Sequence, residues 1–449
     1  MPDKIEDFFS NLLSKDKQRL EQLWSDAVSG EVKLKHGLAD LKEQAQASFE
    51  HWLSNPATVR ALFEGLREVK PNLAVHGLAI VTKHADVLEV LSHDQDFTVR
   101  QIYAAKMERN SGPFFLGMDR GDQYEHEHTL LRMATDPVRD LPAIREIVQR
   151  NAAELIDAAK PGGRIDAVNG LARLIATRVV EEYFGVPGPD EPTMMRWHRA
   201  IFQDIFLNLK DDPAVVARAG AAAKEMNGYT AEFFARRKAE LAAGAKGDDF
   251  LSRLLRMQND PATSFDDAGI QRNVNGTILG AIETTSKAAS QALDQLLSRP
   301  RELAAAQEAA LADDDRLVSS YVFEALRFNP HNPILLRHCE RAYTVASGTN
   351  RQTLIPEGSL VFVGTLAAMF DPDEFQNPND FRVDRPIDKY IHFGHGLHTC
   401  FGEYINLVQV PEILKCLLRL KGLRRAAGPD GVMTLDGSFP DRLIVEFDA

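Results

Sequence analysis

The stretch HFGHGLHTCFG, residues 392–402, places three histidines and one cysteine among three glycines. His395, His398 and Cys400 could supply three ligands to a zinc ion, which takes four protein ligands in a structural site and three in a catalytic one. The glycines favour a different function, because residues without a Cβ let the main chain approach a flat, bulky group and offer amide hydrogens to a sulfur. A haem held by a cysteine thiolate has this need. A glycine-rich turn with a buried, unreactive thiol is the third possibility.

The charge and the cysteine content exclude several classes of protein. The 449-residue chain has 52 Lys and Arg against 65 Asp and Glu, a net charge of −13, so nucleic acid is not expected as a partner. Three cysteines, an odd number, cannot form a disulfide framework and indicate a reducing compartment. The N-terminus lacks the features of a signal peptide, and no apolar run approaches the roughly 20 residues of a membrane span. We therefore expect a cytoplasmic protein without a membrane span.

The hydrophobic pattern predicts a mainly α protein with small β-sheets, an α+β fold. Residues 1–55 are charged and helix-favouring and predict an N-terminal helical extension, which leaves residues 56–449 as one large mixed domain. Residues 72–91 predict a hairpin followed by a helix. Residues 138–310 predict successive amphipathic helices, and strand patterns return after Arg337.

One helical pattern is much longer than the others. It lies between Phe265 and Pro300 and continues without a break for about 32 residues, or roughly 48 Å at the rise of an α-helix. A helix of this length would cross an entire domain.

The cysteine loop resembles a known family. The segment FGHGLHTCFG is similar to the cysteine-ligand loop of the cytochrome P450 superfamily, the haem-thiolate monooxygenases. The positions that match its pattern are Phe393, Gly394, Gly396, His398, Cys400 and Gly402. The resemblance implies the P450 fold with a long central helix over the haem, and Cys400 as the axial ligand of the iron in haem b.

Two further segments carry the same resemblance. EALR, residues 324–327, looks like the family's Glu-x-x-Arg pair, and its three-residue spacing makes Glu324 and Arg327 neighbours on a helix. An isolated pair of this kind is usually a surface salt bridge. The segment DPDEFQNPNDFRVDRP, residues 371–386, is similar to the family's meander, in which Arg385 would complete a buried Glu-Arg-Arg network. The resemblance gives these three residues a structural role.

Haem carries two propionates, so cations are expected at the rim of its pocket. HTLLR, residues 128–132, resembles the helix whose His128 and Arg132 face a propionate. Arg337 matches the strand arginine that reaches the other one, and His398 would join them. A solvated surface charge is the alternative for each of these side chains.

GAIETT, residues 280–285, resembles the oxygen-activating signature of the central helix. The resemblance implies that Glu283 and Thr284 deliver the protons needed to cleave the O–O bond, and that Gly280 and Ala281 lie against the cofactor. Ala281 departs from the family, which usually has Gly there. Thr277 shares a face with these small residues, which predicts a roomy cavity above the haem. The alternative is that the glycine merely permits helix packing or a kink.

The helix expected after Cys400 also departs from the family pattern. Asn406, Leu407 and Gln409 stand where many soluble bacterial relatives have Ala, Arg and Glu, and Pro411 lies inside the helix. This segment neighbours the side from which electrons arrive in the family, so the sequence leaves the identity of the redox partner open.

The resemblance implies a monooxygenase that inserts one atom of O2 into an apolar organic substrate. No flavin-type or iron–sulfur-type domain is visible, so electrons would come from a separate donor such as a ferredoxin or flavodoxin with its reductase. A peroxide-using peroxygenase or a hydroperoxide isomerase is the alternative, followed by a non-catalytic haem sensor. Zinc binding by the cysteine loop is the fourth hypothesis.

Overall fold

The computed structural model describes residues 56–75, 77–209, 211–263 and 265–448. These residues fall into two compact units. Unit 1 contains the described residues up to Ile102 together with Leu326–Cys400 and Leu435–Ser438. Unit 2 contains the described residues of Tyr103–Ala325, Phe401–Thr434 and Phe439–Ala449. The predicted extension over residues 1–55 lies outside the described residues, and the domain over 56–449 stays a prediction.

Unit 1 is built on a five-stranded sheet. In their order across the sheet, the strands are β1 (Asn72–Val75), β2 (Leu78–Val81), β8 (Leu360–Val363), β5 (Leu335–Cys339) and β3 (Phe97–Thr98). The hairpin predicted at residues 72–81 is confirmed, because β1 and β2 pair antiparallel, and Gly77 between them has a φ of 80°. β2 and β8, which are far apart in sequence, pair in parallel, and both are buried along their whole length.

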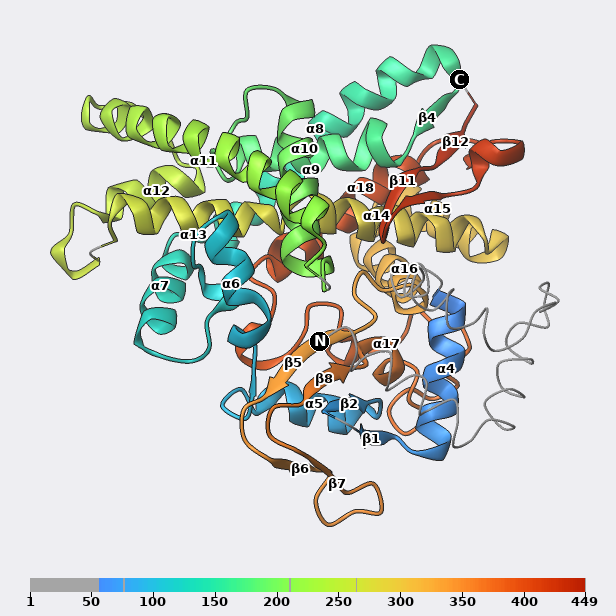
Figure 1. Cartoon of the computed structure of the whole chain (residues 1–449). Coiled ribbons are helices and arrows are strands. Elements are labelled where there is room, and N and C mark those ends of the chain that lie inside the picture. The colour runs from blue at the N-terminus through green and yellow to red at the C-terminus, as the bar shows by residue number, and fades with distance from the viewer. Residues whose placement is uncertain (1–55, 76, 210, 264, 449) are drawn as a thin grey trace. The chain divides into compact units, whose positions relative to one another are not determined.

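Helices and a small ribbon complete unit 1 (Figure 1). These elements are α4 (Pro56–Val69), α5 (His84–Ser92), α17 (Thr365–Ala368), the pair β6 (Tyr343–Val345) and β7 (Thr353–Ile355), and the short turns η6 (Ile387–Lys389) and η7 (Gly396–His398). The core of the sheet region includes Val81, Phe97 and Val361, whose side chains are excluded from solvent. Strand β5 and turn η7 bring two of the predicted site segments into this unit.

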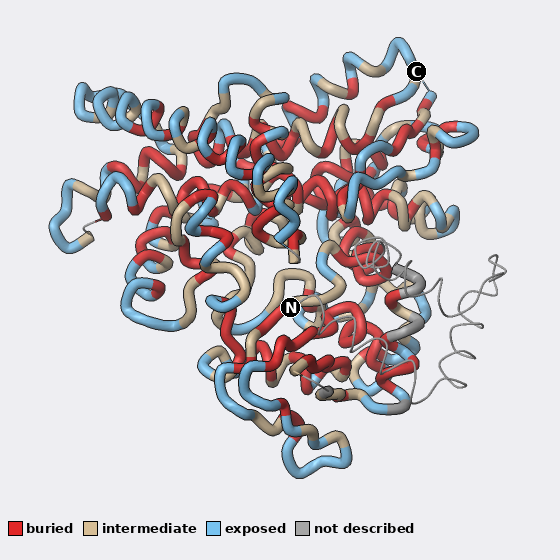
Figure 2. The backbone as a smooth tube through the Cα atoms, viewed as in Figure 1, coloured by how far each residue is buried: buried red, intermediate tan, exposed pale blue. Residues whose placement is uncertain are grey.

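Unit 2 is mainly helical, as predicted, and most of its helices combine buried and exposed residues (Figure 2). They are α7 (Asp122–Met133), α8 (Pro137–Ala159), α9 (Arg173–Glu182), α10 (Glu191–Phe202), α11 (Pro213–Ala242), α12 (Phe250–Met257), α13 (Asp267–Leu279), α14 (Ile282–Leu297), α15 (Pro300–Leu311) and α18 (Glu403–Leu418). Aspartates cap several of these helices: the carboxylates of Asp190, Asp212 and Asp266 accept hydrogen bonds from amides of the first turn.

Smaller elements connect these helices. A three-stranded sheet has the order β4 (Arg164–Asp166), β12 (Ile444–Glu446) and β9 (Arg424–Arg425). Two helices, α6 (Arg100–Asn110) and α16 (Asp315–Phe328), contribute residues to both units. The remaining short elements are η1 (Phe115–Gly117), η2 (Lys160–Gly162), η3 (Val168–Ala172), η4 (Gln203–Leu207), η5 (Pro261–Thr263), η8 (Gly428–Gly431), β10 (Thr434–Asp436) and β11 (Phe439–Arg442).

The long helix predicted between Phe265 and Pro300 is divided into α13 and α14 at Gly280 and Ala281. Here the amides of these two residues bond to carbonyls three residues back, those of Thr277 and Ile278, rather than four. The Thr284 hydroxyl donates to the Gly280 carbonyl oxygen in place of a backbone amide. The prediction of an unbroken helix was therefore wrong at this one turn.

Among the described residues, no helix is both long enough and apolar enough to cross a membrane.

Candidate functional site: a cysteine loop and an accessible helix stripe

The cysteine loop in unit 1 is closed by its own main chain. The Cys400 amide donates a hydrogen bond of 2.8 Å to the Phe393 carbonyl oxygen. Gly394 and Gly396 have φ values of 76° and 73°, in the left-handed region that glycine tolerates. A Cβ on Gly396 would also clash with the Leu91 carbonyl oxygen of α5. Two glycines of the motif are thus required by the shape of the loop.

The three cysteines differ in their surroundings. Cys400 is half-buried, whereas Cys339 on β5 is buried and its Sγ lies 3.0 Å from the Arg341 carbonyl oxygen. Burial raises the pKa of the Cys339 thiol to about 11 and that of the Cys416 thiol, on α18, to about 12. Both are therefore unreactive packing residues, and Cys400 is the best placed of the three to act as a thiolate.

The predicted propionate residues of α7 surround Phe401, which follows Cys400 in the chain. The Arg132 guanidinium lies 4.3 Å from the centroid of the Phe401 ring, and its Nη1 donates to the Phe401 carbonyl oxygen at 3.0 Å. His128 stacks on Tyr124 at 5.2 Å and meets the Phe401 ring edge-on at 6.1 Å. Burial and the positive charge of Arg132 lower the pKa of His128, so the imidazole is neutral at pH 7.

Phe401 has further aromatic neighbours in unit 2. Its ring centroid lies 5.7 Å from that of Phe115 and 6.0 Å from that of Phe250. The family pattern leaves this position unspecified, so sequence reasoning missed its role. A large aromatic residue next to the cysteine was the signal that could have found it.

The predicted structural residues in unit 1 are anchored by main-chain carbonyls. Arg327 is fully buried and donates to the carbonyl oxygens of Met369, Pro378 and Asp380. Arg385 donates to the same Asp380 oxygen at 3.2 Å, but it is half-buried, which corrects the expectation of a buried arginine. Glu324 of α16 belongs to unit 2 and is fully buried there.

Arg337 lies on β5, opposite Val361 of β8, and has 5% of its surface exposed. Its Nη1 donates to the Leu336 carbonyl oxygen at 2.8 Å. His398 ends the turn η7 and is half-buried. In the part of the chain that the structure describes, no group of three or more His, Cys, Asp or Glu side chains could hold a metal ion. His395, His398 and Cys400 therefore do not converge as a zinc site requires.

The central helices of unit 2 carry an accessible stripe. From Asn273 to Leu293 the residues of α13 and α14 are buried with four exceptions. The four are Thr277, Gly280, Ala281 and Thr284. They lie at the spacing i, i+3, i+4 and i+7, which places them on one face of a helix. The face of small residues predicted from the sequence is thus the face that is accessible in this unit.

Glu283 lies outside this stripe. Its side chain is fully buried, and its Oε1 and Oε2 accept hydrogen bonds from Arg173 of α9 at 2.6 Å and from Arg199 of α10 at 2.7 Å. No sequence signal predicted these partners, because the arginines are 110 and 84 residues away in the chain. The carboxylate is thus already paired with two guanidinium groups.

Two of the four unusual residues of α18, Gln409 and Pro411, are buried, and the other two, Asn406 and Leu407, are half-buried. Asn406 accepts a hydrogen bond of 2.9 Å from the Thr285 hydroxyl of α14, and Gln409 is buried. Gln409 is therefore not part of a surface that an electron donor could contact, whereas Asn406 is half-buried. The Asn406 contact joins α18 to α14 within unit 2.

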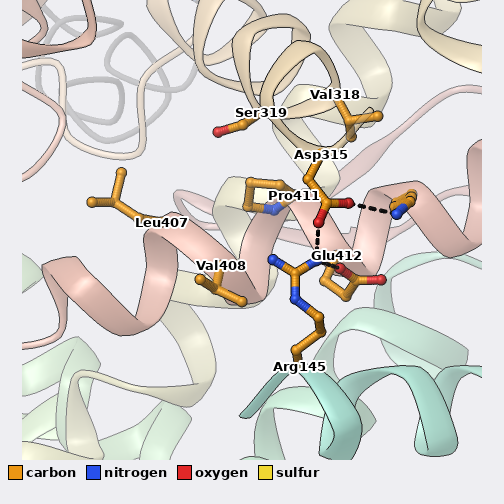
Figure 3. A pocket seen from close by; sticks show the side chains of 9 residues that line it. Arg145, Asp315, Val318, Ser319, Leu407, Val408, Pro411 and Glu412 are labelled. Carbon is orange, nitrogen blue, oxygen red and sulfur yellow. Dashed lines mark hydrogen bonds and ion pairs between the residues drawn. The ribbon is translucent and has the colours of Figure 1, made fainter. Parts of the chain in front are cut away.

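Pro411 lies inside α18 without ending it. It has no amide hydrogen, so the Leu407 carbonyl lacks its usual helical partner. Both residues line a pocket of unit 2 (Figure 3), in which Arg145 of α8 pairs with Asp315 of α16 at 2.7 Å and with Glu412 of α18 at 2.6 Å. These ion pairs hold α18 to two neighbouring helices beside its proline.

Comparisons with known proteins assign the fold and the family. The chain matches the Cytochrome P450 family over residues 72–420. It is 29% identical over 296 residues to the cytochrome P450 monooxygenase PikC of Streptomyces venezuelae, covering 65% of this chain and 66% of PikC. It is 26% identical over 335 residues to a vitamin D(3) 25-hydroxylase of Pseudonocardia autotrophica, covering 73% of this chain and 76% of that relative. The crystal structure of CalO2 has a TM-score of 0.75 at 22% identity, over 88% of this chain and 98% of CalO2.

The fold is that of a haem-thiolate protein, and the chain belongs to the cytochrome P450 family. The predicted function as a monooxygenase of bacterial type, an oxidoreductase that incorporates oxygen from O2, is confirmed by these matches. They do not favour the peroxide-using alternative. The family implies a haem cofactor.

Proposed function

We propose that Cys400 ligates the iron of haem b and that the protein is a cytoplasmic monooxygenase for an amphipathic or apolar organic substrate. The observation that carries the proposal is the glycine-lined loop, in which the half-buried Cys400 follows two left-handed glycines. A thiolate-bound haem supplies the activation of O2 and the cleavage of its O–O bond. The low cysteine count supports a reducing compartment.

Four side chains are proposed to hold the propionates: Arg132, Arg337, His398 and His128. Arg132 uses one donor on the Phe401 carbonyl and keeps others for a carboxylate, because a guanidinium has five N–H groups. His128 can donate a hydrogen bond to a propionate through a ring N–H. Phe393, Gly394 and Gly396 shape the loop around the sulfur.

The stripe of Thr277, Gly280, Ala281 and Thr284 is proposed to border the reaction site. The Thr284 hydroxyl donates to the Gly280 carbonyl, and its oxygen can still accept a hydrogen bond from a water or a protonated oxygen. Thr284 is thus suited to hold a proton donor in place. Glu283 can pass protons to it when one of its two arginine partners moves away, because both of its oxygens are otherwise engaged.

A separate electron donor is required, since the chain has no dinucleotide-binding or iron–sulfur motif. We propose a ferredoxin or flavodoxin with its reductase. The substrate is proposed to be larger than a simple monoterpene. Two observations support this: the accessible stripe consists of small residues, and one relative is named as acting on vitamin D3, a large apolar molecule.

The function is tested with haem-loaded protein, NADPH, a ferredoxin and its reductase, under ¹⁸O₂. Ligands that change the haem spin state are first selected from a panel of large apolar compounds. We expect one ¹⁸O atom in each molecule of product. When NADPH is omitted, we expect no product to form. Product labelled from H₂O₂ but never from O₂ would support the peroxygenase instead, and ligand binding without any product would support a haem sensor.

A further inference from the structure

Lys287 of α14 is a buried amine without a counter-charge. Its side chain has 7% of its surface exposed. Within the described residues its Nζ has neither a hydrogen bond nor an ion pair. The Nζ lies 5.9 Å from the centroid of the Phe439 ring. Burying an ammonium group without a partner is costly, so such groups are normally paired. Lys287 therefore calls for an explanation that packing does not give.

The carboxylate one turn earlier on the same helix does not neutralise Lys287. Glu283 stands four residues before it, which places both on one side of α14. Both oxygens of Glu283 are engaged by Arg173 and Arg199. Arg199 also stacks on Phe439 at 4.4 Å from the ring centroid and adds positive charge near the amine. Two cations thus contact one phenylalanine ring of strand β11.

A second unsatisfied group lies one turn further along the same helix. The Ser290 hydroxyl is buried and has no hydrogen-bond partner among the described residues. Ser290 follows Lys287 by three residues, so the two side chains are neighbours on α14. An ammonium and a hydroxyl can both donate to an oxyanion. This is independent support for a bound anion, since neither group is satisfied by the chain itself.

We propose that Lys287 binds the carboxylate of an amphipathic substrate and that Ser290 supplies a second donor. The Phe439 ring, which the amine already contacts, would pack against the apolar carbons next to the carboxylate. The inference rests on the proposed function, because it assigns the substrate class of that reaction. It predicts long-chain carboxylic acids, rather than neutral compounds, as the preferred ligands.

The test compares dodecanoate with dodecanol, which share a chain and differ in charge. Haem-loaded wild-type protein and the variants Lys287→Met and Lys287→Arg are titrated with each ligand at pH 7, and equilibrium dialysis with radiolabelled ligand measures affinity without relying on the spectrum. We expect the wild type to bind dodecanoate about tenfold more tightly than dodecanol, as one charge-assisted hydrogen bond allows. Lys287→Met should remove this preference by weakening dodecanoate, and Lys287→Arg should keep most of it.

Dodecanol is the internal control, because its affinity should be the same in all three proteins. Dodecyl phosphate is tested as a third ligand. If it binds more tightly than dodecanoate, and if this difference is lost in Lys287→Met, then a phosphate is the preferred anion and the carboxylate assignment is overturned. Equal affinity for acid and alcohol in the wild type, or an acid preference that survives in Lys287→Met, would also overturn the proposal. Either result leaves the ¹⁸O₂ test of the monooxygenase reaction unaffected, so the two failures can be told apart.

Discussion

The guanidinium of Arg132 lies 4.3 Å from the centroid of the Phe401 ring and donates a hydrogen bond of 3.0 Å to the carbonyl oxygen of the same residue. Phe401 is bonded to Cys400. One side chain of α7 therefore fixes both the main chain and the ring of the residue beside the proposed haem ligand. We expect this contact to hold the start of α18 in place. The remaining N–H groups of Arg132 stay available to a propionate.

Replacing Arg132 with Ala removes the ring contact and the hydrogen bond together. The free energy of unfolding should fall by about 1–3 kcal/mol, and haem should be lost more readily during gel filtration. Arg132→Lys keeps the charge but not the planar group, so its stability should lie between the two. The measurement is denaturant unfolding. If Arg132→Ala unfolds with the same free energy as the wild type, the contact does not hold the loop.

Gly276, inside α13, and Gly280, directly after it, form a matched pair of substitution sites. A Cβ on Gly276 would collide with the ring of Phe114, whereas a Cβ on Gly280 would lie 3.4 Å from the Thr277 carbonyl oxygen and meet nothing closer. Gly276→Ala should therefore lower the free energy of unfolding by about 1–3 kcal/mol. Gly280→Ala should change it by less than about 0.5 kcal/mol. Equal losses in thermal or denaturant unfolding would contradict this assignment of the accessible face.

Gly280→Leu tests whether the accessible stripe borders the substrate. The added side chain would project from the stripe without disturbing the buried faces of the helix. Large ligands should bind at least about tenfold more weakly, while haem content and the spectrum of the reduced carbonyl complex stay unchanged. Unchanged affinity for large ligands would show that the stripe faces something other than the substrate.

Thr284→Ala should leave ligand binding nearly intact but divert reducing equivalents into peroxide, because the hydroxyl that orders the proton donor is lost. The measurement is the ratio of product formed to NADPH consumed. Thr284→Ser, which keeps the hydroxyl, is the control and should retain most of the wild-type ratio. A ratio that does not change in the alanine variant would remove Thr284 from proton delivery.

The buried amine of Lys287 makes stability depend on pH. Burial and the charge of Arg199 lower its pKa from 10.5 to about 8, which corresponds to about 3 kcal/mol. Below pH 8 the amine is charged in both states, and the folded state is destabilised by the full amount. Between pH 8 and 10.5 the amine deprotonates first in the folded state, so the destabilisation decreases. Above 10.5, its pKa in the unfolded state, the amine is neutral in both states and the destabilisation is gone. Without added ligand, Lys287→Met should therefore be more stable than the wild type at pH 7, and the difference should shrink as the pH rises to 10. A pH-independent difference in unfolding free energy would be inconsistent with a charged, buried lysine.

Local signals in the sequence predicted most elements of the fold. Alternating and helical apolar patterns with Asp, Gly and Pro at their ends predicted the hairpin of β1 and β2 and the helices of unit 2. The break between α13 and α14 was missed because glycine and alanine are compatible with an unbroken helix, and the change in hydrogen bonding there depends on a threonine hydroxyl. The strand β4 was missed because three residues give too short a pattern.

The candidate site was predicted mainly through resemblance. Matching motifs placed Cys400, Arg132 and Thr284, but their roles stay predictions until they are tested. The arginine partners of Glu283 could not be predicted, because pairing between distant helices leaves no local trace in the sequence. Lys287 did leave one: it is the single charged residue among the nine that follow Thr284, on the same helix side as Glu283.

The absorption spectrum of the reduced carbonyl complex tests the central claim, that Cys400 ligates the haem iron. Wild-type protein, Cys400→Ser, Cys339→Ser and Cys416→Ser are compared at equal haem content. We predict a strongly red-shifted Soret band in the wild type and in the Cys339 and Cys416 variants, and its absence in Cys400→Ser. A red-shifted band that persists in Cys400→Ser, or that disappears with either of the other two cysteines, would contradict the assignment.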